Sequence, residues 1–149
     1  LARKAGSTMT HAATAGETVE RRHENRRILV VDDEPNNREV IVAILETVGL
    51  FADCAANGGE AVALAGNSHY DLILMDLQMP TMDGIEATRR IRRLPENAQT
   101  PILALTGNVV NEVREQCRNA GMNGFVAKPF SMNALLQAVT RSLRSPAPG

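Results

Sequence analysis

Tryptophan is absent from this sequence of 149 residues, and only four side chains are aromatic, which leaves little material for stacking nucleic-acid bases. A surplus of basic charge is missing too, because 16 basic residues face 17 acidic ones, and this balance argues against a general binder of polyanions. No apolar run approaches the roughly 18 residues of a membrane span, and no signal-peptide pattern opens the chain. We therefore predict no nucleic-acid partner and no direct membrane contact.

Cysteine and lysine are also scarce. The two cysteines, Cys54 and Cys117, cannot form a disulfide framework, and we interpret both as reduced, small, buried hydrophobic side chains. Reduced thiols predict a cytoplasmic domain, within a parent protein that could carry a membrane anchor elsewhere. The only lysines are Lys4 and Lys128. Because lysine is so rare in the body of the chain, the place of Lys128 directly after an apolar run favours a specific role for it.

The length predicts one domain, at about 150 residues per domain. Residues 1–26 show no apolar periodicity, so we interpret them as a linker or disordered tail; residues 27–144 form the patterned body, and residues 145–149 a short polar tail. Because the chain begins with Leu1 and not with methionine, we expect that it was cut from something longer.

The body alternates short apolar runs with amphipathic stretches. Apolar runs predict strands over 28–31, 51–55, 72–75, 102–105 and 124–127, and helical spacing predicts a helix after each, over about 35–48, 60–65, 85–93, 109–120 and 132–143. Strands that are apolar throughout indicate a parallel sheet covered on both faces, and right-handed crossovers favour a doubly wound three-layer α/β sandwich. We interpret the cluster Arg89, Arg90, Arg92 and Arg93 as solvated charge favoured by the helix dipole.

Polar side chains stand at the carboxyl ends of the predicted strands, where open α/β sheets bind ligands. They are Asp32, Asp33, Asp76, Thr106 and Lys128. Three carboxylates at one edge repel one another, and a hard divalent cation such as Mg²⁺ resolves the conflict while leaving a position for a phosphoryl oxygen. Lysine is a familiar partner for phosphate, and threonine can donate one hydrogen bond to it. The set suits a phosphoryl group held on a carboxylate, with Asp76 as the nucleophile.

Each of these residues also has a plainer interpretation. An aspartate after a strand is often a loop residue or a helix cap, Thr106 could simply end its strand, and Lys128 could be surface charge. Asp83-Gly84 reads as ordinary turn chemistry. What favours a site is the joint occurrence, with one polar residue at the end of each of several successive apolar strands.

Four ordered motifs carry a specific resemblance. Ile-Leu-Val-Val-Asp-Asp-Glu-Pro (28–35), Leu-Met-Asp-Leu-Gln-Met-Pro-Thr-Met-Asp-Gly (74–84), Ala-Leu-Thr-Gly-Asn (104–108) and Phe-Val-Ala-Lys-Pro-Phe (125–130) resemble those of response-regulator receiver domains, and the second and third look most like receivers of hybrid sensor histidine kinases. The resemblance runs from about Arg27 to Arg144. It implies a flavodoxin-like strand order, 2-1-3-4-5, with five helices.

The resemblance also implies a phosphoryl site. Asp76 would take a phosphoryl group from a phosphohistidine, and Lys128 would contact both that group and Asp76. Asp33 and Asp76 would bind Mg²⁺ (or Mn²⁺) directly, together with the backbone carbonyl of Gln78, whereas Asp32 would act through a bound water.

A conformational switch is implied as well. Thr106 would shift toward the phosphoryl group and let the ring of Phe125 turn inward, without the hydroxyl that a tyrosine would bring to this position. The peptide bond between Lys128 and Pro129 would be cis, although only about 5–6% of such bonds are. Partners would be a histidine kinase or a histidine phosphotransfer domain. A weak dimer through the helix before Gly121, strand 124–127 and the last helix is possible.

Several functional hypotheses stay open on the sequence. The first is a phosphoacceptor receiver, as the C-terminal receiver of a hybrid histidine kinase or as a stand-alone response regulator. A second is an interaction domain that works without phosphorylation, against which the intact set of polar residues argues. A third is a small phosphatase, which would want a second carboxylate two residues after Asp76, where Gln78 stands.

Overall fold

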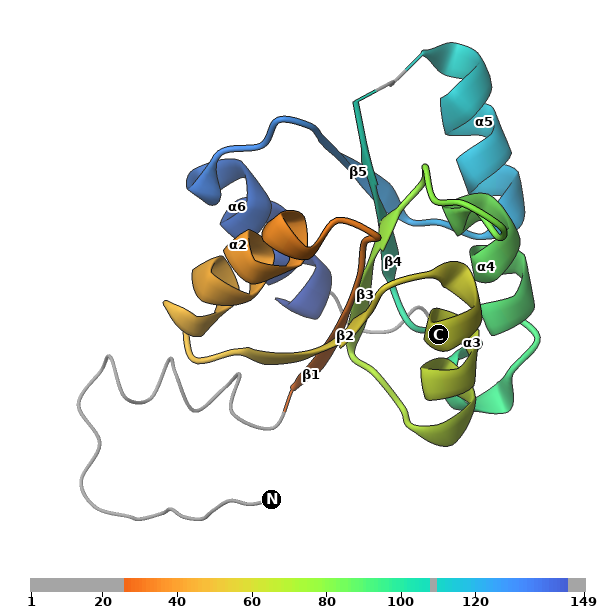
Figure 1. The fold of residues 1–149 in the computed structure, drawn as a ribbon, viewed down its shortest axis with the longest axis horizontal. Coiled ribbons are helices and arrows are strands. Elements are labelled where there is room, and N and C mark those ends of the chain that lie inside the picture. Colours follow the sequence, from red (N-terminus) through yellow and green to blue (C-terminus); the bar gives the residue numbers. More distant parts are fainter. Residues whose placement is uncertain (1–25, 108–109, 145–149) are drawn as a thin grey trace.

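Five short apolar strands build a single parallel sheet in the computed structural model, which describes residues 26–107 and 110–144 (Figure 1). The strands are β1 (Arg27–Val31), β2 (Phe51–Ala55), β3 (Leu72–Asp76), β4 (Ile102–Thr106) and β5 (Gly124–Ala127). Their order is β2-β1-β3-β4-β5, and every neighbouring pair is parallel. The predicted order 2-1-3-4-5 is therefore confirmed. Of the predicted tails over 1–26 and 145–149, residues 1–25 and 145–149 lie outside the described residues, whereas Arg26 donates to the carbonyl of Leu143 at 3.2 Å.

Helices cover the sheet on both faces, as a doubly wound sandwich requires. They are α2 (Pro35–Glu46), α3 (Gly58–Asn67), α4 (Gly84–Ile91), α5 (Asn111–Ala120) and α6 (Met132–Arg144), with a short 3-10 helix, η2 (Pro95–Asn97), that the sequence analysis did not predict. Helices α2 and α6 lie on one face and α3, α4 and α5 on the other (Figure 1). In the described ranges, no helix is both long and apolar enough to cross a membrane.

Two cores result, because successive side chains of a strand point to opposite faces. Ile28 and Val30 of β1 pack in the core beneath α2 and α6, whereas Leu29 and Val31 pack in the core beneath α3, α4 and α5. The central strands β3 and β4 are buried along their whole length.

Strand β2 departs from the prediction that the strands are covered on both faces. It lies at the edge of the sheet, and Phe51 exposes 68% of its surface. Cys54 is exposed, so our interpretation of it as a buried hydrophobic side chain was wrong, while Cys117 is buried as predicted. The physical reason is position: β2 has a neighbouring strand on one side only, so its side chains are less completely covered than those of the central strands.

Arg92 corrects a second expectation. Its guanidinium donates to the carbonyl of Gly121 at 3.0 and 2.7 Å, to that of Asn97 at 3.1 Å, and to Oδ1 of Asn123 at 2.9 Å. It is therefore a partly buried structural residue and not solvated charge, whereas Arg89 and Arg90 are exposed. Gly121 ends α5 in the left-handed conformation, with φ 111°, and a side chain there would collide with that of Arg92.

Candidate functional site

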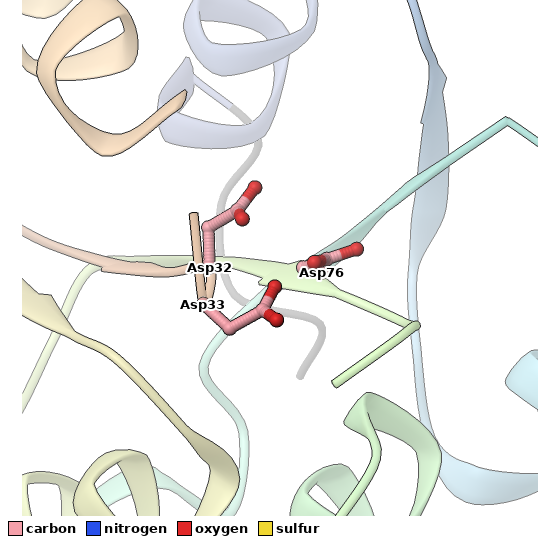
Figure 2. Close-up of side chains that lie close together, drawn as sticks. All are labelled: Asp32, Asp33 and Asp76. Carbon is pink, nitrogen blue, oxygen red and sulfur yellow. The ribbon is translucent and has the colours of Figure 1, made fainter. Parts of the chain in front are cut away.

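Three carboxylates meet at the carboxyl edge of the sheet, from two neighbouring strands. Asp32 and Asp33 follow β1, and Asp76 is the last residue of β3, which pairs with β1 so that Val31 lies opposite Met75. Each residue offers a carboxylate oxygen within 4.8 Å of the other two (Figure 2). Asp32 and Asp76 are buried, while Asp33 is exposed. The predicted convergence of these side chains is thus present.

Asp32 is fixed by the turn into α2. Its carboxylate accepts hydrogen bonds from the backbone N–H of Glu34 at 2.9 Å and from the side chain of Asn37 at 3.4 Å. Arg38 donates to the carbonyl of Asp32 at 2.7 Å. The sequence analysis missed Asn37 and Arg38 as supports of the site. The available signal was Pro35, which begins α2 so soon after Asp32 that the first turns of the helix face back onto it.

Lys128 brings the one ammonium that contacts this site within the described residues. Its Nζ lies 3.3 Å from Oδ2 of Asp32 and 3.2 Å from Oδ1 of Asp76. Its backbone N–H donates to the carbonyl of Thr106 at 2.8 Å, and the Lys128–Pro129 peptide is cis, as the resemblance implied. Burial lowers the pKa of Lys128, but the charges of Asp76 and Asp32 outweigh that effect and raise it above its usual value. Lys128 is therefore charged at neutral pH.

The surroundings of Asp76 disfavour its charged form. Burial and the charge of Asp32 raise the pKa of Asp76, while Lys128 and the backbone N–H of Gln78, which donates to Asp76 at 3.3 Å, oppose that rise. The net direction is upward, so its charged form is undercompensated in the protein alone. A nucleophilic carboxylate in this state gains from any further positive charge nearby.

The loop after β3 packs tightly against Asp76. Asp83 caps the N-terminus of α4 by accepting from the backbone N–H of Glu86 at 2.9 Å, and Gly84 donates to the carbonyl of Leu77 at 3.1 Å. A Cβ atom on Gly84 would collide with the carbonyl oxygen of Asp76. Asp83-Gly84 is therefore more than a turn, because only glycine lets the start of α4 approach the end of β3 this closely.

The donor set fits a hard divalent cation. Three carboxylates face a single ammonium, Asp33 is open to solvent, and burial together with the charge of Asp32 raises the pKa of Asp76. Mg²⁺ prefers such oxygen ligands, uses few carboxylates and keeps several waters. The magnesium prediction is thus supported by the chemistry of the residues present.

The two remaining predicted residues lie beside this cluster. Thr106 is buried at the end of β4, opposite Ala127, and Phe125 lies on the next strand, opposite Ala104. Phe125 is partly buried against the core beneath α3, α4 and α5. Asn108 and Val109, which the sequence analysis placed in the third motif and in the following helix, lie outside the described residues.

Comparison with known proteins gives this arrangement a family. The model of the response regulator receiver domain matches residues 28–140. A probable histidine kinase 4 of Oryza sativa subsp. japonica is 38% identical over 139 residues, which cover 79% of this chain and 14% of that protein. The chain thus spans about a seventh of the length of this curated relative.

Solved structures agree with this assignment. The receiver domain of a sensor histidine kinase from Pseudomonas aeruginosa, with a magnesium ion in its active-site cleft, is 42% identical, with a TM-score of 0.75 over 80% of this chain and 98% of that one. Chemotaxis protein CheY4 of Vibrio cholerae is 33% identical, with a TM-score of 0.77 over 79% and 98%. The chain therefore belongs to the response regulator receiver family, the phosphoacceptor domains of two-component signalling, and is homologous to the receivers of hybrid histidine kinases.

Proposed function

We propose that Asp76 is the residue that accepts the phosphoryl group, from a phosphohistidine of a histidine kinase or a histidine phosphotransfer domain. The observation that carries this proposal is the contact between a carboxylate only 6% exposed and the ammonium of Lys128 at 3.2 Å, beside two further carboxylates. Asp76 is the last residue of the buried strand β3, which fixes its position. Phosphoryl transfer needs such positioning, and charge neutralisation, more than it needs acid–base groups.

The neighbouring residues divide the work of charge neutralisation. Asp33 and Asp76, with the backbone carbonyl of Gln78, would hold Mg²⁺ or Mn²⁺ directly, and Asp32 would act through a bound water. When bound, this cation withdraws negative charge from the phosphoryl oxygens. Lys128 orients Asp76 before transfer and pairs with the phosphoryl group after it, and Thr106 donates its hydroxyl to a phosphoryl oxygen.

The transfer itself balances without an added acid or base in the receiver. An oxygen of the Asp76 carboxylate forms a bond to phosphorus as the phosphorus–nitrogen bond of phosphohistidine breaks. The electron pair of that bond stays on the imidazole nitrogen, which takes a proton from solvent. Asp76 becomes an acyl phosphate, and no redox change occurs.

The output follows from the charge added at Asp76. Thr106 moves toward the phosphoryl group, the ring of Phe125 turns into the space it leaves, and the surface of α5, β5 and α6 changes. This surface would contact partners and could support a weak dimer. The receiver would span residues 27–144 between two tails, on the cytoplasmic side, most simply as the C-terminal receiver of a hybrid histidine kinase.

Incubation with Mg²⁺ and acetyl phosphate, followed by intact mass measurement, tests the proposal. We expect one added phosphoryl group, lost in Asp76→Asn. Asp83→Asn is the matched control, because asparagine also caps helices well and the same loop is changed by the same chemistry.

Each alternative predicts a different result in this experiment. Absence of an adduct on the folded wild-type protein would support an interaction domain that works without phosphorylation. Sustained release of phosphate with multiple turnovers would support a small phosphatase. An adduct that survives Asp76→Asn would assign the phosphoacceptor to another residue.

A further inference from the structure

Phe125 and Thr106 share one face of the sheet. Phe125 on β5 lies opposite Ala104 on β4, and Thr106 on β4 lies opposite Ala127 on β5. Since side chains two residues apart point to the same face, the four side chains form a small quadrilateral with Phe125 and Thr106 at opposite corners. The other two corners are alanines. From these two strands, no bulky side chain stands between the ring and the threonine.

The ring also has a charged neighbour on α5. The guanidinium carbon of Arg114 lies 5.4 Å from the centroid of the Phe125 ring, within the range of a cation–π contact. Arg114 is itself exposed, one turn into a helix whose N-terminal cap, Val110, makes no side-chain capping hydrogen bond. The contact therefore joins the ring of β5 to the end of α5 that lies nearest to Thr106.

We propose that Arg114 is a positioning residue for the switch, which holds the Phe125 ring in the orientation seen here and so sets how readily it turns inward. Phenylalanine has no hydroxyl to hydrogen-bond in either orientation, so its preference depends on packing and on what faces the ring. Arg114 is exposed and Phe125 is only partly buried, so their contact lies toward solvent, and a ring turned inward toward the buried Thr106 would leave it. The contact consequently favours the unphosphorylated state.

Thermodynamic reciprocity gives this contact a measurable effect at Asp76. If Arg114 favours the state that binds a phosphoryl group less well, its removal must strengthen the binding of that group by up to the same factor. An exposed cation–π contact corresponds to roughly a two- to fivefold change in the equilibrium. This inference rests on the proposed function, because it assumes that occupancy of Asp76 and the orientation of Phe125 are coupled.

The test measures the affinity for beryllofluoride, a mimic of the phosphoryl group, in the presence of Mg²⁺. We expect Arg114→Gln to bind it about two- to fivefold more tightly than the wild type. Arg118→Gln, one turn further along α5, removes the same charge from the same helix and should leave the affinity unchanged. Arg114→Lys, which keeps a cation able to face the ring, should restore part of the wild-type affinity.

A double-mutant cycle shows whether the effect passes through the ring. In the Phe125→Leu background, Arg114→Gln should no longer alter the affinity, because the aromatic partner is gone. An equal effect in both backgrounds would overturn the proposal.

NMR of the Phe125 ring in the absence of beryllofluoride separates this proposal from the proposed function. Arg114→Gln should shift the ring toward the inward orientation even if Asp76 binds nothing, and an unchanged ring would overturn the inference. Failure of the wild-type protein to bind beryllofluoride would instead count against the phosphoacceptor role of Asp76.

Discussion

Asp76 illustrates how a single residue can be tuned at the expense of folding. Its carboxylate is almost fully buried, has Asp32 as a neighbour of like charge, and is only partly compensated by Lys128. A folded-state pKa raised above the unfolded value means that the protein without metal is more stable when Asp76 is protonated. The charged, buried carboxylate of Asp76 therefore lowers the stability of the metal-free protein at neutral pH.

Replacement of Asp76 by asparagine should consequently stabilise the metal-free protein at neutral pH. We expect a gain in the free energy of unfolding on the order of 1 kcal/mol. The sign follows from the raised pKa: the charged wild-type carboxyl disfavours folding above its folded-state pKa, and the difference between the proteins declines as the pH falls through that pKa and is lost below the unfolded value of about 4. Urea unfolding at several pH values, with a chelator present, measures this. A stability gain that is equal at neutral and acidic pH would contradict the electrostatic explanation.

For the residues of the site, the sequence could predict which side chains lie together but not how exposed each one is. Asp32, Asp33, Asp76 and Lys128 could be brought together because parallel strands end at one edge, so their positions in the chain imply their proximity. The exposure of each could not be predicted. Asp32 is buried where Asn37 and Arg38 of α2 and the ammonium of Lys128 contact it, whereas Asp33 is exposed.

At the scale of elements, α4 and α5 are joined by one arginine. Arg92 follows α4 and reaches the carbonyls of η2 and of the turn after α5, where it also meets Asn123, whose side chain accepts from the backbone N–H of Ile102 at 2.8 Å. Sequence reasoning grouped Arg92 with its exposed neighbours, since a run of arginines at the end of a helix does not reveal which one faces inward. The C-terminal end of α5 is thus tied to α4, η2 and β4 through hydrogen bonds.

Arg92→Lys should destabilise the domain although it keeps the charge. Lysine cannot reproduce the planar fork that reaches several carbonyls at once, so hydrogen bonds to partly buried groups are lost. We expect a loss of about 1–3 kcal/mol in the free energy of unfolding, measured in urea. Arg93→Lys, at the exposed neighbouring position, should cost less than about 0.5 kcal/mol. Equal losses in the two variants would show that the hydrogen bonds of Arg92 contribute little.

At the scale of the whole molecule, the carboxylates and the ammonium of the site gather at the carboxyl ends of the strands, and the central strands that support them are buried along their whole length. The three layers could be predicted, because continuous apolar runs separated by amphipathic helices fit few topologies, whereas the strand order was implied by the resemblance to receiver domains. The exposure of β2 could not be predicted, since a short apolar run does not show whether its strand will lie at the centre or at the edge of the sheet. The concentration of carboxylates at one edge links metal binding to the stability of the entire fold.

Addition of Mg²⁺ should raise the melting temperature of the domain. A ligand that binds only the folded state adds about 1.4 kcal/mol at a free concentration of about ten times its Kd, or roughly 3–6 °C for a domain of this size. Asp33→Asn should abolish the rise, and because Asp33 is exposed this variant should fold normally. Asp83→Asn should keep the rise. A full Mg²⁺ effect in Asp33→Asn would remove Asp33 from the ligand set.

The exposed thiol on β2 has a practical consequence for measuring these events. Cys54 is accessible and Cys117 is buried, so a thiol-directed fluorophore or spin label would attach to the folded native sequence at one defined position. The next residue, Ala55, accepts a hydrogen bond from the backbone N–H of Asp32 at 3.1 Å. A label on Cys54 would therefore be attached next to a residue that contacts the carboxylate cluster directly. The wild-type chain therefore carries its own attachment point for a reporter beside the site, with no engineered cysteine needed.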